Sequence, residues 1–168
     1  MTKKLIVLVV IICVLSLNKQ EQVKIPKESI RFRVIANSNT KKDQNLKKKI
    51  VKNLSKKLVK TNNLIDIEST RDFIKKDLPL FTGIVDKTLK ENNYNRNFHI
   101  NYGKNYFPEK NYNGILYEEG EYESLVVTLG EGLGENFWCV LFPPLCFVEE
   151  NNEVEYKSVI KEIIEKYF

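Results

Sequence analysis

The hydrophobic period of the sequence changes near Asn92 and Asn93, and this change limits the fold more than any other feature. Between Leu46 and Leu89 apolar residues recur at helical intervals, whereas beyond Asn93 they alternate with polar residues, as in strands. A chain that contains both periods folds into helices packed on a sheet. The sequence therefore predicts a mixed α/β (α+β) fold, in which about three helices pack on a short sheet that is mostly antiparallel or mixed.

The expected elements form a single domain over residues 30–168. In chain order they are a strand at 30–35, a helix containing Leu46, Ile50, Leu54 and Leu58, a helix at about 70–89, strands at 98–102, 125–129 and 137–142, and a closing helix at 156–167. We expect Pro79 to kink or split the second helix. The last two strands are apolar on both faces, which predicts central positions in the sheet.

The first 17 residues are expected to direct export. Lys3 and Lys4 precede an apolar run from Leu5 to Leu17, which is the layout of a secretory signal peptide. A membrane-spanning helix needs about 20 apolar residues. No Ala-x-Ala cleavage site follows the run. The segment could therefore stay uncleaved as an amino-terminal anchor, and in either case it contacts the membrane during export. Residues 18–29 are polar and are expected to form a linker.

Two cysteines, Cys139 and Cys146, lie beyond the export segment and flank Pro143 and Pro144. In an exported protein they could close a small disulfide loop, since a Pro-Pro bend can bring two Cα atoms close together. The alternative is a pair of buried, reduced thiols, and the sequence leaves both open. No metal is expected, because His99 is the only histidine and no CxxC motif is present.

Charge is divided unevenly along the chain, although the net charge is only +5. Residues 1–108 carry 23 basic and 9 acidic side chains, and residues 109–168 carry 4 and 13. Lysines outnumber arginines 23 to 4, whereas sites that read nucleic-acid sequence favour arginine. We therefore interpret the lysine-rich segment 41–60 as a solvated helix face and expect no nucleic-acid partner.

Two patterns could suggest an enzyme. The segment Gly130-Glu131-Gly132-Leu133-Gly134 follows a strand, but another strand and not a helix follows it, so we expect a hairpin or bulge instead of a phosphate loop. A thiol enzyme would need Cys139 or Cys146 beside His99. His99 alternates with apolar neighbours and is expected to face away from them. The sequence thus predicts no catalytic constellation and no cofactor.

Four ordered segments carry a resemblance to a known family. The most specific is Phe137-Trp138-Cys139-Val140-Leu141-Phe142-Pro143-Pro144-Leu145-Cys146-Phe147, after the glycine-rich segment; the others begin at Arg31, Tyr106 and Gly120. Together they resemble the stage II sporulation protein R family of endospore-forming bacteria. This sequence departs from the family pattern at Asn39, Glu119 and Phe137, and none of these positions carries a candidate catalytic group.

The resemblance implies an exported signalling protein and not an enzyme. Members of that family are secreted across the forespore membrane into the intermembrane space. There they activate a membrane-embedded aspartic protease, stage II protein GA, which processes the precursor of the early mother-cell sigma factor. A thiol-dependent enzyme of the intermembrane space, such as a wall hydrolase, and a non-catalytic adhesion module are the alternatives.

The residues that we assign to these roles lie mainly in the acidic carboxyl-terminal third of the chain. The hypothesised partner-binding surface consists of Trp138, Pro143, Pro144, Leu145 and Phe147. The family motif residues with an expected structural role are Arg33, Asn37, Ser38, Gly130, Gly132 and Gly134. The acidic third therefore becomes the expected recognition face.

Overall fold

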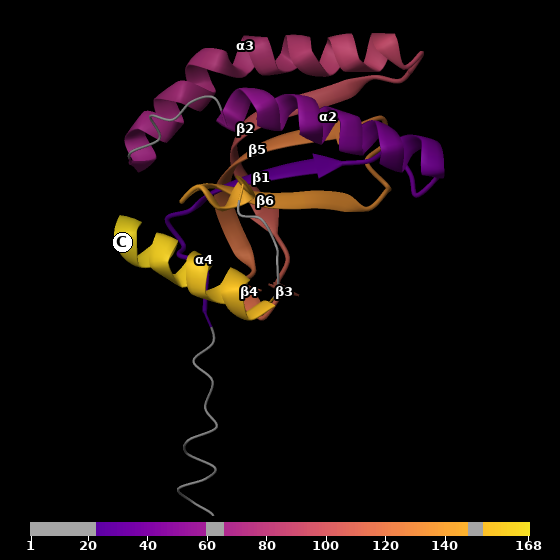
Figure 1. Cartoon of the computed structure of the whole chain (residues 1–168). Helices are drawn as coiled ribbons and strands as arrows, with labels where there is room; N and C mark the ends of the chain where they lie inside the picture. The colour runs from indigo at the N-terminus through magenta and orange to yellow at the C-terminus, as the bar shows by residue number, and fades with distance from the viewer. Residues whose placement is uncertain (1–22, 60–65, 148–152) are drawn as a thin grey trace, which may run out of the picture.

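A four-stranded sheet organises the molecule in the computed structural model, which describes residues 23–59, 66–147 and 153–168 (Figure 1). Its strands, in spatial order, are β2 (Phe98–Phe107), β5 (Gly120–Leu129), β1 (Ile30–Ile35) and β6 (Asn136–Phe142). A second, two-stranded sheet contains β3 (Lys110–Tyr112) and β4 (Ile115–Tyr117). The expected export segment, residues 1–17, lies outside the described residues.

The large sheet is mixed, as the sequence predicted. Strand β1 runs parallel to β5 and antiparallel to β6, and β2 runs antiparallel to β5. One sequence prediction was wrong, because β6 lies at the edge of this sheet and not at its centre. Its apolar residues are nevertheless covered on both faces, since one face joins the helical core and the other contributes to a second core. A strand that is apolar on both faces has other elements packed above and below it. It does not need a neighbouring strand on each side.

Helices cover the sheet from opposite sides. Figure 1 shows α2 (Lys41–Val59) and α3 (Ile67–Glu91) over one face, and α4 (Glu153–Tyr167) with β3 and β4 on the other side. The larger core lies under α2 and α3 and includes the β1 residues Ile30, Phe32 and Val34. A smaller core lies on the α4 side; its buried members are Ile25, Ile115, Val140, Leu145, Tyr156 and Ile160.

The second half of the expected linker is packed against the domain. Ile25 is only 2% exposed and belongs to the smaller core. Its backbone N–H donates a hydrogen bond of 3.1 Å to the carbonyl of Leu116, and the N–H of Leu116 donates to the carbonyl of Val23. Residues from Val23 onward are therefore part of the folded unit.

The start of α2 has only one half of a reciprocal capping box. The Oγ1 of Thr40 accepts a hydrogen bond from the N–H of Asp43, as in a capping box. However, the Asp43 carboxylate accepts hydrogen bonds from Asn37 and Ser38 instead of returning to Thr40. The Thr40 N–H donates to the Ser38 hydroxyl. The helix start is thus connected to the carboxyl end of β1.

Helix α3 is longer than predicted and is not split at Pro79. It begins after an Asp66 N-cap, whose side chain accepts from the N–H of Ser69, and the Ser69 hydroxyl completes a capping box. Pro79 lies inside the helix, and Figure 1 shows that α3 bends along its length. The lost hydrogen bond at a helical proline is tolerated here because Ile74, Phe81 and Val85 are fully buried against the sheet.

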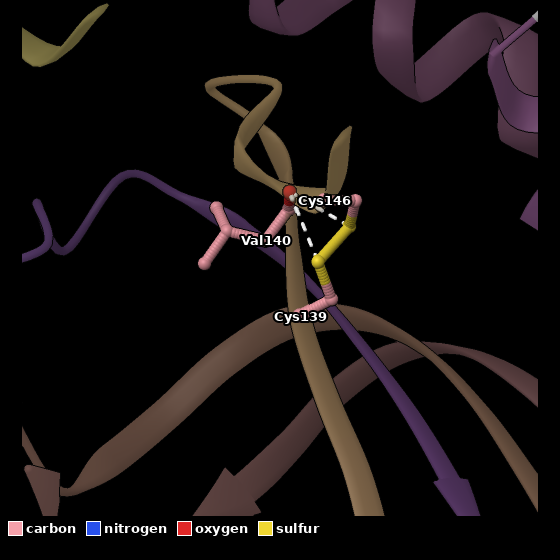
Figure 2. Close-up of a disulfide and its surroundings, with 3 residues drawn as sticks. All are labelled: Cys139, Val140 and Cys146. Atoms are coloured by element: carbon pink, nitrogen blue, oxygen red, sulfur yellow. Dashed lines mark hydrogen bonds between the residues drawn. A yellow bond between two sulfur atoms is a disulfide. The ribbon is translucent and has the colours of Figure 1, made fainter. Parts of the chain in front are cut away.

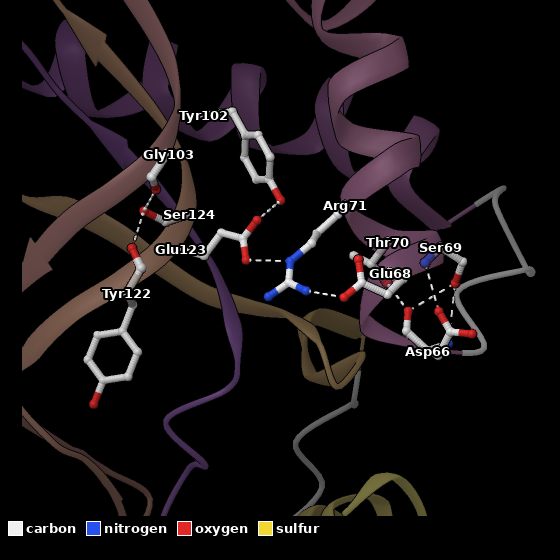
Figure 3. Close-up of polar contacts among 10 residues, drawn as sticks. All are labelled: Asp66, Glu68, Ser69, Thr70, Arg71, Tyr102, Gly103, Tyr122, Glu123 and Ser124. Carbon is white, nitrogen blue, oxygen red and sulfur yellow. Dashed lines mark hydrogen bonds and ion pairs between the residues drawn. The ribbon is translucent and has the colours of Figure 1, made fainter.

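A carboxylate on β5 joins α3 to the sheet. Glu123 accepts a 2.7 Å hydrogen bond from Nε of Arg71 on α3, and its second oxygen accepts from the hydroxyl of Tyr102 on β2 (Figure 3). Arg71 also pairs with Glu68. Burial, followed by the hydrogen bond to Glu123, raises the pKa of Tyr102. Because both Arg71 and Glu123 are more than two-thirds buried, this pair contributes more than an exposed one.

We predict that replacing Glu123 by Gln lowers the free energy of unfolding by about 1–3 kcal/mol, because hydrogen bonds to a charged group are lost. Urea denaturation of the purified variant measures this change. Asp86→Asn is the matched control, since its pair with Lys90 is exposed, and we expect no measurable change there. Equal effects in the two variants would contradict the role assigned to Glu123.

Candidate functional site

A cavity of about 390 Å³ lies on the α4 side of the sheet. We call it the aromatic pocket; it is lined by Arg31, Phe107, Pro108, Lys110, Tyr112, Tyr117, Asn136, Phe137, Trp138, Cys139, Val140, Leu145, Cys146 and Tyr156. These residues come from β1, from β6 and the η1 turn (Leu145–Phe147) after it, from the β2–β3 region, from β4 and from α4. The pocket combines aromatic rings with two cationic side chains, Arg31 and Lys110.

Arg31 is the most deeply buried cation of the pocket, at 2% exposure. Its guanidinium carbon lies 3.3 Å from the ring centroid of Tyr122, and it also lies over the rings of Phe107 and Tyr117. Burial lowers its pKa. Within residues 23–59, 66–147 and 153–168, its Nε has no hydrogen-bond partner, so the aromatic rings are the main compensation for this buried charge.

Besides Arg31 at the other rings, two cations lie near the ring of Trp138. The guanidinium of Arg33 lies 4.4 Å from the Trp138 ring centroid, and Nζ of Lys110 lies 5.3 Å from it. Phe107 meets the indole edge to face, with centroids 5.2 Å apart. Burial lowers the pKa of Arg33 as well. The pocket wall at Trp138 is thus both aromatic and electropositive.

A disulfide between Cys139 and Cys146 forms part of the same wall (Figure 2). Of the two states left open by the sequence, the structure has the oxidised one, with Cα atoms 5.3 Å apart. The sulfur of Cys146 lies 3.0 Å from the carbonyl oxygen of Val140. The bond joins strand β6 to the η1 turn and so holds Leu145 beside Trp138 in the lining.

The expected partner-binding residues are only partly brought together. Trp138 and Leu145 line the aromatic pocket. Pro143 is buried, and the peptide bond before it is cis, while Pro144 is half-buried. Neither proline is among the lining residues. The side chain of Phe147 lies outside the described part of the structure.

Several lining residues were not anticipated from the sequence. They come from four different elements and are Arg31, Lys110, Tyr112, Tyr117 and Tyr156. One signal was available: Arg31 and Arg33 alternate with apolar residues in β1, so both point to the face opposite the helical core. Burial raises the pKa of Tyr117, and a hydrogen bond with Tyr156 adds to this effect.

A second cluster lies at the carboxyl ends of the parallel strands β1 and β5. The glycine-rich segment after β5 was expected to be a hairpin or bulge, and this prediction was wrong. Because β1 lies between β5 and β6, the segment passes over the end of β1. The N–H groups of Leu133 and Gly134 donate to the carbonyls of Asn37 and Ala36. The connection therefore closes onto the Asn37-Ser38 motif.

Two glycines allow this close approach. Gly130 has φ +56°, and a Cβ there would lie 2.2 Å from Oδ1 of Asn37. That oxygen accepts a hydrogen bond from the N–H of Glu131. A Cβ at Gly134 would lie 2.4 Å from the carbonyl oxygen of Ser38, a contact that no side-chain rotation relieves. Gly132 closes a turn onto Leu129 between them.

Polar side chains complete the cluster. Asp43 accepts hydrogen bonds of 2.8 and 2.6 Å from Asn37 and Ser38. Burial raises the pKa of Asp43, but the hydrogen bonds from Asn37 and Ser38, together with the positive charge of Arg96 and a hydrogen bond with Thr40, lower the pKa overall. Lys47 on α2 donates to the carbonyl of Glu135 and is itself buried, unlike the solvated face expected for this lysine-rich helix. These contacts join the end of β1, the glycine segment and the start of α2 to one another.

The structure does not bring the candidate thiol and imidazole together. His99 is exposed on β2, while Cys139 lies on β6, and these strands form opposite edges of the sheet. Both sulfurs are also joined in the disulfide. Within the described residues, no three His, Cys, Asp or Glu side chains are grouped so as to hold a metal ion. Among those residues, no helix has both the length and the apolar character needed to cross a membrane.

Comparison with known proteins connects these features to a family. A model of the family described as Stage II sporulation protein R matches residues 26–152. The chain is also 37% identical over 155 residues to the Stage II sporulation protein R of Bacillus subtilis (strain 168), covering 89% of this chain and 69% of that protein.

The chain belongs to the stage II sporulation protein R family. This membership supports a role in sporulation. The matched range contains most of the aromatic pocket, the disulfide and the glycine cluster, although Tyr156 on α4 lies beyond it. No solved structure was found to match the chain, so the arrangement of these motifs is described from this structure alone.

We predict that Gly134→Ala lowers the free energy of unfolding by at least about 2 kcal/mol, because the new Cβ overlaps a backbone oxygen and forces a shift. Thermal or urea unfolding measures the loss. Gly83→Ala in α3 is the matched control: no atom lies within 4 Å of its Cβ position, so it should be neutral or stabilise by about 0.5–1 kcal/mol. A neutral Gly134→Ala would contradict the close approach.

Asp43→Asn tests the charged hydrogen bonds. The folded-state pKa of Asp43 is lowered, so its carboxylate stabilises the fold above the unfolded pKa of about 3.9, and this contribution disappears as pH falls. The variant should therefore be less stable than the natural chain at pH 7, and the difference should shrink at pH 3. A difference in unfolding free energy that is the same at both pH values would contradict this assignment.

Proposed function

We propose that this protein is an exported sporulation signal that activates the membrane-embedded aspartic protease, stage II protein GA. That protease then processes the precursor of the early mother-cell sigma factor. The observation that carries the proposal is the family membership, with 37% identity over 89% of the chain. The apolar segment Leu5–Leu17 after two lysines supports export from the forespore into the intermembrane space. If the segment is not cleaved, the protein is tethered to the membrane.

The structure is compatible with a binding role and has features expected of one. A signalling ligand needs a rigid surface that has aromatic anchors and loses little conformational entropy on binding. The aromatic pocket provides Trp138 and Leu145 on a wall that a disulfide fixes to β6. We place the contact with the protease at this wall. The ligand acts by binding the active state of the protease more tightly than its inactive state.

A thiol-dependent enzyme is the weaker alternative. It would need a free thiolate beside a base. Here Cys139 and Cys146 are joined to each other, and His99 lies at the other edge of the sheet. The structure contains no observation that favours the adhesion module over the activator.

The proposal predicts that the purified protein, added to membranes that carry the protease and the sigma-factor precursor, causes cleavage of that precursor. Immunoblotting of the precursor and its product measures the reaction. Absence of cleavage with the natural chain would overturn the proposed function. Denatured protein serves as the negative control.

In the same assay, Trp138→Ala should reduce processing at least tenfold, because it removes the central aromatic group of the wall. Leu80→Ala is the matched control, since Leu80 is an exposed apolar residue on α3, on the opposite side of the sheet. The Leu80→Ala variant should cause as much processing of the precursor as the natural chain. Circular dichroism verifies that both variants are folded. Full activity of a folded Trp138→Ala variant would move the contact away from the aromatic pocket. Pro143 is less suitable for this test because it is buried.

A further inference from the structure

We propose that the aromatic pocket binds the carboxylate of an acidic side chain in a peptide segment of the partner protein, while apolar neighbours of that side chain pack on the pocket's rings. The inference rests on the proposed function, which supplies a protein partner. It adds what that function leaves open, namely the chemistry of the recognised segment.

The first argument is an excess of positive charge. Arg31, Arg33 and Lys110 all lie within about 6 Å of the rings of Phe107 or Trp138. Among the described residues, none of the three forms an ion pair, whereas Lys24 and Arg71 elsewhere do. Arg31 is buried and Arg33 is half-buried, whereas Lys110 is exposed, and buried cations are normally paired with an anion. A carboxylate entering the pocket would supply the missing partner.

The second argument is an unpaired donor. Arg31 is 2% exposed, lines the pocket, and its Nε has no hydrogen-bond partner among the residues that the structure describes. One Nη donates only a long bond of 3.4 Å to the carbonyl of Glu118. Stacking on Tyr122 covers a face of the guanidinium, but it leaves Nε without a hydrogen-bond acceptor among the described residues. A planar carboxylate is the group that matches a guanidinium edge.

The third argument concerns the rest of the ligand. Asn136, which also lines the pocket, has a buried Oδ1 that accepts no hydrogen bond from the described part of the chain. A simple carboxylate or phosphate has no N–H to offer it, whereas a peptide backbone does. Between Arg31 and Asn136 the wall is apolar and aromatic, with Trp138 and Val140. The combination favours a peptide with a carboxylate, a backbone amide and an apolar side chain.

The chain offers its own reporter for this binding. Trp138 is the only tryptophan and lines the pocket, so its fluorescence responds when a ligand enters. The full-length chain is titrated with N-acetyl-Leu-Glu-Leu-amide, with the matched N-acetyl-Leu-Gln-Leu-amide, and with sodium acetate. We expect a saturable change with the Glu peptide, at least tenfold tighter than with the Gln peptide or acetate.

Lys110→Glu tests the charge without disturbing the core, because Lys110 is exposed on β3. It should weaken binding of the Glu peptide at least tenfold. Lys104→Glu is the matched control. Lys104 is also exposed, lies on β2 two residues from Tyr102 of the helical core, and so points to the opposite face. The Lys104→Glu variant should bind the Glu peptide as tightly as the natural chain.

The inference is overturned if the Glu peptide causes no saturable change, if the Glu and Gln peptides bind with equal affinity, or if both lysine variants weaken binding equally. Equal affinity for acetate and the Glu peptide would assign the pocket to small carboxylates and would equally overturn the peptide proposal.

The processing assay separates this inference from the proposed function. If the natural chain causes cleavage and Lys110→Glu does so equally well, the activator role stands and the acidic-segment proposal falls. If the natural chain causes no cleavage, the activator role falls, and the fluorescence titration alone decides whether the pocket binds acidic peptides. Loss of cleavage in Lys110→Glu but not in Lys104→Glu supports both.

Discussion

Two arginines on a central strand set the constraint on which the rest of the structure depends. Strand β1 lies between β5 and β6 and carries Arg31 and Arg33 on the face opposite the helices. Taking a charge out of water costs several kcal/mol, and each aromatic contact returns about 0.5–2 kcal/mol. Every other strand of the large sheet contributes one ring: Phe107 from β2, Tyr122 from β5 and Trp138 from β6. The two arginines are therefore tolerated on a central strand because the strand order brings these three rings over them.

The aromatic pocket follows from this arrangement. The hairpin β3–β4 and helix α4 lie over this layer of rings and cations and leave a cavity between them and the sheet. The disulfide holds the η1 turn at the rim. At the far end of β1, the glycine segment passes over Asn37 and keeps β5 and β6 on either side of the strand. The disulfide segment and the glycine segment thus stabilise the same sheet at its opposite ends.

Periodicity was sufficient to predict the fold class but not the neighbours of each strand. Alternation correctly predicted the strand at 30–35, and the four-residue spacing from Leu46 to Leu58 correctly predicted helix α2. That Ile30, Phe32 and Val34 face this helix is a finding of the structure. The edge position of β6 was missed, because its apolar faces are filled by two separate cores. The glycine segment was misread as a hairpin for the related reason that pairing across β1 is nonlocal.

The site was harder to predict than the fold. Trp138 and Leu145 were identified through a contiguous motif, whereas Arg31, Lys110 and Tyr156 converge from elements far apart in the sequence. No local sequence pattern indicates that these three residues come together in the fold. The cysteine spacing allowed a disulfide but equally allowed buried thiols, and the bond became evident only when β6 and the η1 turn were placed together.

The central claim is that recognition takes place on the pocket side of the sheet and not on its helical side. Hydrogen exchange of the full-length chain, measured with and without membranes that carry the protease, tests this claim directly. The account predicts slower amide exchange in residues 110–117 and 136–146 when the protease is present, with no change in α2 and α3. Protection confined to α2 and α3 would contradict it.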